Sequence, residues 1–437
     1  MPSKSRELQS NQQRFIVTLY SVTMLFNVQY ATMSPVLPFD ITALIIDIVG
    51  ENNDTDLLKE LSLVSHSFHQ DCSKHLFSTV ELHDATNYGR RSSKKGFIKL
   101  VKSRPNVVKY IRKVHYKWSI KNDDDHLLSP IFSNFLPTTS RLNCLEIDGA
   151  CQTFDWNTLD SSLTSAFLHL MCLPTINHID LTFIHNFPLS SLTRSVNLHQ
   201  LGIFHLSFDQ PEIVVESEMP KIRELRTSHS HWVRGQYKLF NAKTQDGRPA
   251  FNFMDLRQFR TYLWEPEDER NVRYLLQNAK LLEKLHIDVE NRGSLVGLHD
   301  SLSPVAPTLK VLRLWPSLSL AGLYEELEAM AGHYTLEALS IIFDHDSHND
   351  GEASILGSNI QKVGRVLVRP GWSTLRRVFF TVRGSYSGLT DREKLSMSET
   401  LQCLPDKYLS HLSKLDSISF HYSLADSKYF EPDNFLF

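Results

Sequence analysis

The most regular feature of the chain is a recurring triplet of apolar positions, written L-x-x-L-x-L, which extends from Ile111 to Phe420. The last two apolar positions of each triplet are two residues apart, which is the period of a β-strand with one buried face. The first residues of the eleven triplets are Ile111, Leu142, Ile176, Leu198, Ile222, Leu256, Leu282, Leu309, Leu336, Leu375 and Leu415. The pattern predicts eleven short strands at intervals of 22 to 40 residues.

The segments between the triplets have the periodicity of helices. Leu163, Phe167 and Leu170 fall on one helical face, and so do Leu323 and Leu327. Prolines that end such helices stand just ahead of several strands, namely Pro137, Pro174, Pro220 and Pro307. An alternation of helix and short strand that is repeated so many times predicts an α/β solenoid with a parallel sheet on its inner face.

Over residues 83–437 this pattern resembles irregular leucine-rich repeats. The resemblance implies a parallel sheet on the concave face of the solenoid and helices on the outside. The ninth position of the repeat, which is usually Asn or Cys, is occupied by other residues, among them Ala150, Ile184, Leu206 and Ser230. The sheet of an α/β enzyme is an alternative source of apolar strand triplets, but such a sheet does not require eleven of them in a row.

A different pattern precedes the repeats. Ile41, Leu44, Ile45 and Ile48 form one apolar stripe, and Pro38 suits the first turn of the same helix. Two further helices are predicted from the apolar residues Leu57, Leu58, Leu61 and Val64, and Phe68, Cys72 and Leu76. Three short helices in so few residues bury little surface, so we expect contacts with a partner or with the rest of the chain to stabilise this module.

The same residues resemble an F-box. The family pattern is matched by Leu37-Pro38-Phe39-Asp40, Ile45, Ile48, Asp56-Leu57-Leu58, Leu61-Ser62-Leu63-Val64-Ser65 and Phe68. Asp40 stands where Glu is more usual, and Phe68 where Trp is common. The predicted domains are therefore a disordered or wrongly predicted extension (1–34), an F-box-like helical module (35–82) and the repeat solenoid (83–437).

The F-box resemblance implies a substrate-recognition subunit that binds a Skp-type adaptor and, through it, the cullin of a ubiquitin ligase. The residues that match adaptor-facing positions of the family are Leu37, Pro38, Ile41, Ile45, Leu57 and Leu58. In the alternative interpretation these side chains pack only against the downstream domain. The chain is then an interaction scaffold whose F-box-like module caps the solenoid.

The residue between the last two apolar positions of a triplet points to the opposite face of the sheet, which is the inner surface of the solenoid. The candidate target-binding residues in the central repeats are Arg226, Arg260, His286, Arg313, Tyr262 and Trp315. Arginines bind carboxylates or phosphates, and aromatic side chains provide anchors, so one hypothesis is a site for an acidic or phosphorylated segment of a target protein. The alternative is a solvated surface whose charge Asp288 partly neutralises. In the last triplet the same rule assigns Ser419 and His421 to this face.

Composition narrows the function further. The 437 residues carry 46 Lys and Arg against 49 Asp and Glu, a net charge of −3, which does not favour nucleic acid binding. No apolar stretch reaches the roughly 20 residues of a membrane span, and five scattered cysteines favour a cytoplasmic or nuclear protein. We recognise no catalytic, metal-binding or cofactor motif, and residues 344–351 are interpreted as a solvated loop. No enzymatic activity and no cofactor are predicted.

Overall fold

The computed structural model divides the chain into two compact units, Met1–Ser78 and Thr79–Phe437. The described residues are 39–426 without 84–93, 120–124, 137, 139, 150–151, 210–218, 229–234, 245, 264–265, 290–294, 317–321, 347–351, 386–389, 413 and 416. The predicted extension at 1–34 lies outside them. The predicted boundary after residue 82 is wrong by four residues, because residues 79–82 form a strand that belongs to the second unit.

The described part of the first unit, from residue 39 on, contains three helices, as the apolar spacing predicts. They are α2 (Phe39–Glu51), α3 (Thr55–Ser62) and α4 (His66–Leu76). The carboxylate of Asp54 caps α3 by accepting from Leu57 N at 3.1 Å, and the hydroxyl of Ser65 caps α4 by accepting from Phe68 N at 3.3 Å. The core of the unit is made of the side chains of Ile46, Val49, Leu58 and Cys72.

The second unit is a single parallel sheet with helices, which confirms the predicted α/β fold class. Its strands are β1 (Thr79–Leu82), β2 (Lys113–Lys117), β3 (Cys144–Asp148), β4 (Phe154–Asp155), β5 (His178–Phe187), β6 (Gln200–Phe208), β7 (Glu224–Thr227), β8 (Gln258–Leu263), β9 (Lys284–Val289), β10 (Val311–Pro316), β11 (Ala338–Asp346), β12 (Arg377–Ser385) and β13 (Ser419–Asp426). They lie in chain order, except that the short β4 pairs only with β5 beside the main path.

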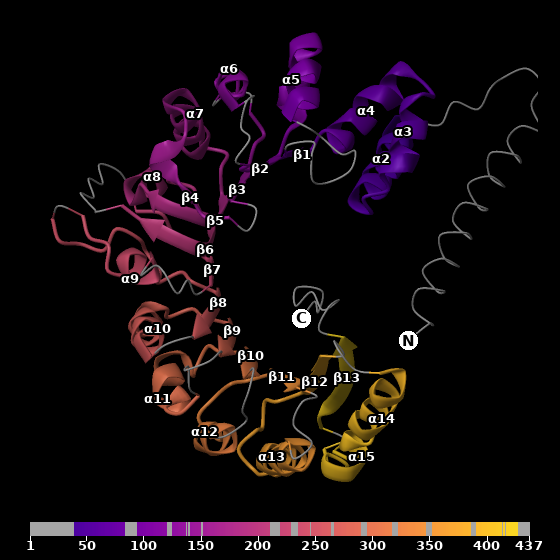
Figure 1. Cartoon of the computed structure of the whole chain (residues 1–437), viewed down its shortest axis with the longest axis vertical. Coiled ribbons are helices and arrows are strands. Elements are labelled where there is room, and N and C mark those ends of the chain that lie inside the picture. Colours follow the sequence, from indigo (N-terminus) through magenta and orange to yellow (C-terminus); the bar gives the residue numbers. More distant parts are fainter. Residues whose placement is uncertain are drawn as a thin grey trace, which may run out of the picture. The chain divides into compact units, whose positions relative to one another are not determined.

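The helices lie on the outer side of this unit and the strands on its inner side (Figure 1). The α-helices are α5 (Lys94–Ser103), α6 (Ser129–Phe132), α7 (Ser161–Met171), α8 (Leu189–Thr193), α9 (Gly235–Phe240), α10 (Pro266–Asn278), α11 (Leu298–Leu302), α12 (Leu323–Met330), α13 (Glu352–Leu367), α14 (Asp391–Gln402) and α15 (Leu404–Tyr408). Short 3₁₀ helices cover Pro105–Tyr110, Asp125–Leu127, Trp156–Thr158 and Ser303–Val305. The core lies between the sheet and the helices, where strand residues such as Leu145, Ile179 and Leu312 are fully buried.

The strand register follows the triplets with three differences, one of which is the short β4, which no triplet marks. β1 precedes the first triplet and pairs in parallel with β2, although no triplet marks it. In β13, Phe420 pairs with Val378 and His421 with Phe379, so the last triplet is displaced by two residues from the predicted alignment. His421, rather than Ser419, therefore continues the central row of inner-face residues. Two triplets end in threonine, and both threonine side chains lie in the core like the apolar residues of the other triplets. There, Thr227 Oγ1 donates to Thr261 Oγ1 at 3.0 Å.

Candidate functional site

The candidate site is the inner face of the sheet, which we define by one residue in register on each strand from β2 to β13 other than β4. These residues are His115, Glu146, Asp180, Gly202, Arg226, Arg260, His286, Arg313, Ser340, Phe379 and His421. In a parallel sheet, residues in register on neighbouring strands lie side by side on the same face. The fold thus aligns side chains from the whole second unit in one row, and most of the charged ones lie between β2 and β10.

Arg226 on β7 is bound to carboxylates of its own face. Its Nη2 donates to both oxygens of Asp180, at 3.2 Å and 3.0 Å, and its Nε lies 3.6 Å from Glu224 Oε1. Burial opposes ionisation of Asp180, but the hydrogen bond from His178 and the charge of Arg226 outweigh it, so the pKa of Asp180 is lowered. The small Gly202 lies between Asp180 and Arg226 in the row. A Cβ at this position would stand 2.0 Å from Asp180 Oδ1.

The next arginine, Arg260 on β8, faces a buried carboxylate. Asp288 on β9 is almost inaccessible to solvent, its Oδ2 lies 3.5 Å from Arg260 Nη2, and its Oδ1 lies 2.7 Å from His286 Nε2. Arg313 on β10 is buried beside them. The alternative that Asp288 neutralises part of the positive charge therefore agrees with the geometry.

Burial lowers the pKa of His286. The carboxylate of Asp288 raises it, the charges of Arg313 and Arg260 lower it, and the balance leaves the pKa below the usual value. The unfolded chain binds a proton at this residue near pH ~6.5, whereas the folded chain stays neutral to lower pH. The unfolded state then holds more protons in that range, so folding stability is lost as the pH falls below about 6.5.

We therefore expect wild type to lose thermal stability between roughly pH 7 and pH 5, and a His286→Gln variant to lose less of it. The measurement is the unfolding midpoint of the two proteins across this range. His333→Gln, a change at an exposed histidine, is the matched control and is expected to follow wild type. An equal loss in wild type and His286→Gln would contradict the assignment.

A third charged group lies at the carboxyl ends of β10 to β12. Trp315 Nε1 donates to Asp344 Oδ2 at 3.1 Å, Arg383 Nε lies 2.7 Å from Asp344 Oδ1, and the Arg383 guanidinium stacks over the Trp315 ring at 3.9 Å. The interpretation of 344–351 as a solvated loop is wrong for Asp344, because β11 extends to Asp346. The part at 347–351 lies outside the described residues.

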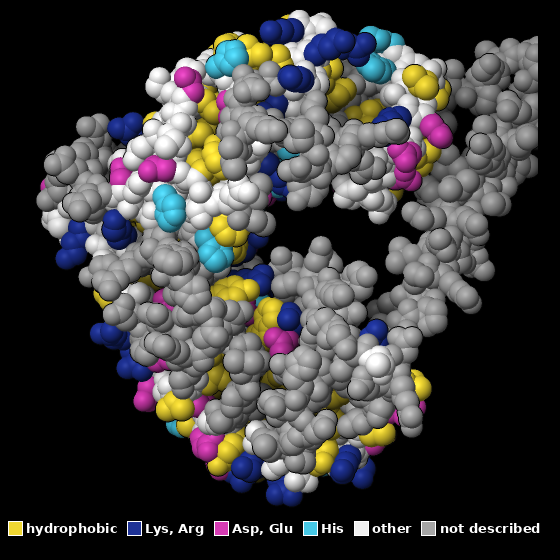
Figure 2. All heavy atoms as spheres, viewed as in Figure 1, with side chains coloured by type: hydrophobic (Ala, Val, Ile, Leu, Met, Phe, Trp, Pro, Cys, Tyr) yellow, Lys and Arg dark blue, Asp and Glu magenta, His cyan; other side chains and the backbone are white. Residues whose placement is uncertain are grey.

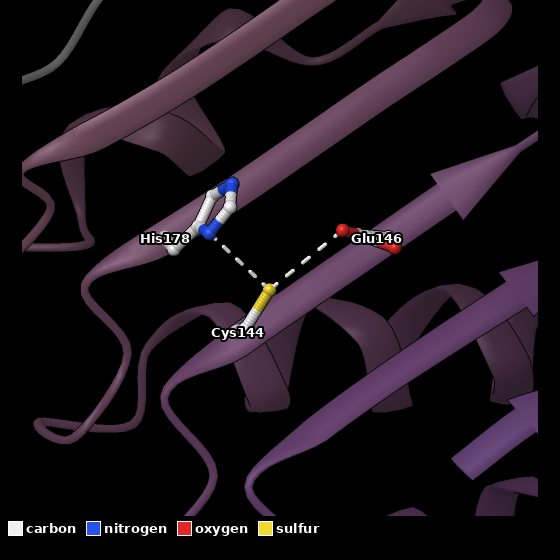
Figure 3. Close-up of side chains that lie close together, drawn as sticks. All are labelled: Cys144, Glu146 and His178. Atoms are coloured by element: carbon white, nitrogen blue, oxygen red, sulfur yellow. Dashed lines mark hydrogen bonds between the residues drawn. The ribbon is translucent and has the colours of Figure 1, made fainter. Parts of the chain in front are cut away.

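At the amino-terminal end of the sheet the inner face carries acidic residues, a thiol and histidines, some in the central row and some in the row next to it. Lys113 Nζ lies 2.6 Å from Glu146 Oε1, and His115 Nδ1 lies 3.5 Å from Glu146 Oε2. Cys144 is in register with His178 on the neighbouring strand, and Figure 3 shows its thiol between His178 and Glu146. The Cys144 Sγ to His178 Nδ1 distance is 3.4 Å, and the Sγ to Glu146 Oε1 distance is 4.0 Å.

Sequence reasoning did not identify this group, because its residues belong to different repeats. Cys144 and His178 are 34 residues apart and match no ligand-spacing motif. The signal that could have found them is the repeat itself. Both residues directly precede the second apolar position of their triplets, so alignment of the triplets places one beside the other.

The structure brings the predicted target-binding residues together on the inner face. Arg226, Arg260, His286 and Arg313 stand in one row, and Tyr262 and Trp315 flank it in the next row. Arg226 and Arg260 face carboxylates of the same sheet, so the inner face presents a network of paired charges rather than an excess of positive charge. Figure 2 draws another side of the molecule, on which Lys and Arg side chains and Asp and Glu side chains are both scattered.

The predicted adaptor-binding residues divide into three groups. Leu37 and Pro38 lie outside the described residues. Ile41 is exposed, whereas Ile45 and Leu57 are half-buried against the core of the first unit. Leu58 is only 2% exposed, so its assignment to the adaptor surface is wrong: its side chain is part of the core and has almost no area to offer a partner.

The first unit has an exposed apolar stripe that the predicted set only partly contains. Ile41, Leu44 and Ile48 are 46%, 59% and 39% exposed, and they follow one another along one side of α2. Leu63 and Val64, which directly follow α3, are also exposed. Contiguous exposed apolar side chains of this kind are typical of a protein-interaction surface.

Comparison with known proteins assigns no family to the chain. No family model matches it, and no curated protein matches its sequence. One of the solved structures similar to it is the leucine-rich repeat-containing protein LegL7 from Legionella pneumophila, with a TM-score of 0.37 and 12% identity over 82% of this chain and 93% of that chain. Among the described helices, none is long and apolar enough to cross a membrane. The description of the second unit as a repeat solenoid rests on its own strand order and register.

Proposed function

We propose that the chain is the substrate-recognition subunit of a Skp-cullin-F-box ubiquitin ligase. The first unit would bind the Skp-type adaptor, and the inner face of the second unit would bind a protein target. The chain itself would perform no bond chemistry, because ubiquitin transfer takes place on partner subunits. Its contribution would be to hold the target close to them, which raises the effective concentration of the target.

The observation that carries this proposal is the apolar stripe of Ile41, Leu44 and Ile48. A helix of a soluble protein normally turns its apolar side chains toward the core. In α2, Ile46 and Val49 do so, whereas the three stripe residues remain accessible on another side of the helix. A second apolar side on a short helix is suited to a groove of a partner, which removes it from water. The resemblance of residues 37–68 to an F-box specifies the partner as a Skp-type adaptor.

The inner face supports the second half of the proposal. It is a continuous surface built by parallel strands, and solenoids use such surfaces to bind other proteins. Arg226 and Arg260 already have carboxylates beside them on this face, so a target does not need to supply a counter-charge. It would instead bring complementary polar groups and pack against Tyr262 and Trp315. Target capture that depends on phosphate alone is therefore less favoured than a mixed polar and aromatic contact.

The proposal is tested with a double variant of the stripe, Leu44→Asp/Ile48→Asp. Two carboxylates in a buried interface are expected to weaken adaptor binding by at least ~30-fold, since hot-spot residues contribute about 2 kcal/mol or more. The measurement is the recovery of purified Skp-type adaptor by the full chain in a pull-down. Met254→Asp/Leu281→Asp, two exposed apolar positions of the second unit, is the matched control and should retain the adaptor.

The alternative, a scaffold capped by its helical module, predicts a different result. Wild type would then recover no adaptor, and the stripe variant would lower the unfolding temperature of the full chain because the cap is damaged. Adaptor recovery that is equal for the stripe variant and wild type would contradict the proposed docking surface.

A further inference from the structure

A cluster of possible metal ligands lies at the amino-terminal end of the inner face. Cys144 and Glu146 are two residues apart on β3 and so project from the same side of the sheet, and His178 stands beside Cys144 on β5. One ligand atom from each of the three residues can be chosen so that all three lie within 4.8 Å of one another. In Figure 3 the imidazole and the carboxylate both approach the thiol.

The distances are close to those of a metal site. A tetrahedral zinc ion with bonds of about 2.3 Å to sulfur and about 2.0 to 2.2 Å to nitrogen or oxygen holds its ligand atoms about 3.5 Å apart. The sulfur to nitrogen distance is 3.4 Å, and the sulfur to oxygen distance is 4.0 Å. All three ligand atoms lie within 4.8 Å of one another, so the Glu146 carboxylate has to move toward the other two ligand atoms to complete the arrangement.

The surroundings of His178 also suit a metal ligand. Its Nδ1 faces Cys144, while its Nε2 lies 3.1 Å from Asp180 Oδ2 and 2.9 Å from Arg226 Nη2, which donates to the same carboxylate. Histidines that bind metals commonly donate a hydrogen bond from their second ring N–H to a carboxylate, which fixes the ring and makes the free nitrogen a better ligand. Asp180 is in turn held by Arg226, so the ring is oriented before any ligand arrives.

The ammonium group of Lys113 would compete with a metal ion for the carboxylate of Glu146. Its ammonium lies 2.6 Å from Glu146 Oε1, and its side chain is 37% exposed. The ammonium provides the positive charge that a metal ion would otherwise bring to this carboxylate. Because the side chain is exposed and flexible, it can move into solvent when an ion binds, at the loss of one ion pair.

We propose that Cys144, Glu146 and His178 bind one zinc ion, with a water molecule as the fourth ligand. A thiolate together with an imidazole selects zinc over magnesium or calcium, which prefer oxygen ligands. The same residues are less suited to be a nucleophilic thiol site. Cys144 is buried, and the backbone of β3 is paired with strands on both sides, so its N–H groups are not free to stabilise an oxyanion.

The test uses the full chain after removal of metals with a chelator, and cobalt(II) as a spectroscopic substitute for zinc. Wild type is expected to bind one equivalent and to develop a thiolate-to-cobalt charge-transfer band. Cys144→Ser should abolish the band, whereas Cys172→Ser, a change at an exposed cysteine, should leave it unchanged. Asp180→Asn should weaken zinc affinity by about 10- to 100-fold, as outer-shell changes do.

Lys113→Met provides a variant with the opposite expected effect. Without the competing ammonium it should bind zinc more tightly than wild type, and a structural role of the cluster alone would not produce that gain. Should Cys144→Ser fail to fold, the rate of Cys144 alkylation in wild type serves as a second measurement, and zinc should slow it. No band in wild type, a band that survives in Cys144→Ser, or alkylation that zinc does not slow would each overturn the proposal. None of these measurements involves the adaptor, so the zinc site and the proposed function can fail separately.

Discussion

Replacement of Asp125 by alanine is expected to destabilise the second unit by about 3 to 5 kcal/mol, because it leaves a buried lysine without its carboxylate. Lys94, at the start of α5, is 1% exposed, and its Nζ lies 2.7 Å from Asp125 Oδ1. Tyr116 on β2 donates to the other carboxylate oxygen at 2.6 Å, and the Lys94 ammonium lies 4.6 Å from the centre of the Tyr116 ring. The measurement is the free energy of unfolding in denaturant.

The matched control removes both charges at once. A Lys94→Met/Asp125→Leu/Tyr116→Phe triple variant removes the ion pair together with the hydroxyl that donates to it, and replacement of a buried ion pair by apolar residues is often neutral or stabilising. We expect it to unfold within about 1 kcal/mol of wild type or above it. A loss below about 1 kcal/mol for Asp125→Ala would mean that water reaches Lys94, in contradiction to the buried position.

Phe167→Ala is expected to cost about 3 to 5 kcal/mol of folding stability, the range measured for aromatic residues removed from packed cores. Phe167 on α7 is fully buried, and its ring centre lies 5.0 Å from that of Tyr116, 5.6 Å from that of Phe132 and 6.1 Å from that of Trp156. The cavity would open among large rings, which cannot shift far to fill it. The unfolding free energy of the variant measures the loss.

Leu136→Ala serves as the control for Phe167→Ala, because Leu136 is an exposed apolar residue that follows α6 in the chain. It is expected to change stability by at most about 0.5 kcal/mol. Tyr116 contacts both Phe167 and Asp125, so we further expect the effects of Phe167→Ala and Asp125→Ala not to add. A cost below about 1.5 kcal/mol for Phe167→Ala would contradict a tightly packed core at this point.

Much of the fold follows from local periodicity. The triplet at Leu309, Leu312 and Leu314 predicts β10 and its buried face, because alternate residues of any strand point to opposite sides. The stripe of Leu163, Phe167 and Leu170 predicts α7 for the corresponding reason in a helix. The triplets do not predict β1, because only Val80 and Leu82 mark it. They also do not predict the displacement in β13, because both Ile418 and Phe420 suit the second apolar position.

The candidate site was predictable in part. Counting from the triplets places the inner-face row from Arg226 to Arg313. It does not show which of the charged side chains are paired with one another. The pairing of Arg260 with Asp288, and of Arg226 with Asp180, depends on the distance between side chains of different strands. The zinc ligands depend in the same way on the register of β3 and β5.

The sequence by itself determines which residues form strands and helices and which side of each strand is buried, because these properties depend on the spacing of side chains along one segment. Tertiary structure alone decides which strands are neighbours, in what register they pair, and therefore which charged or ligand side chains meet. Cys144 and His178 are adjacent because the sheet aligns their strands residue by residue. A distance of a few ångströms between residues from separate repeats is a property of packing, and no local pattern in the chain encodes it.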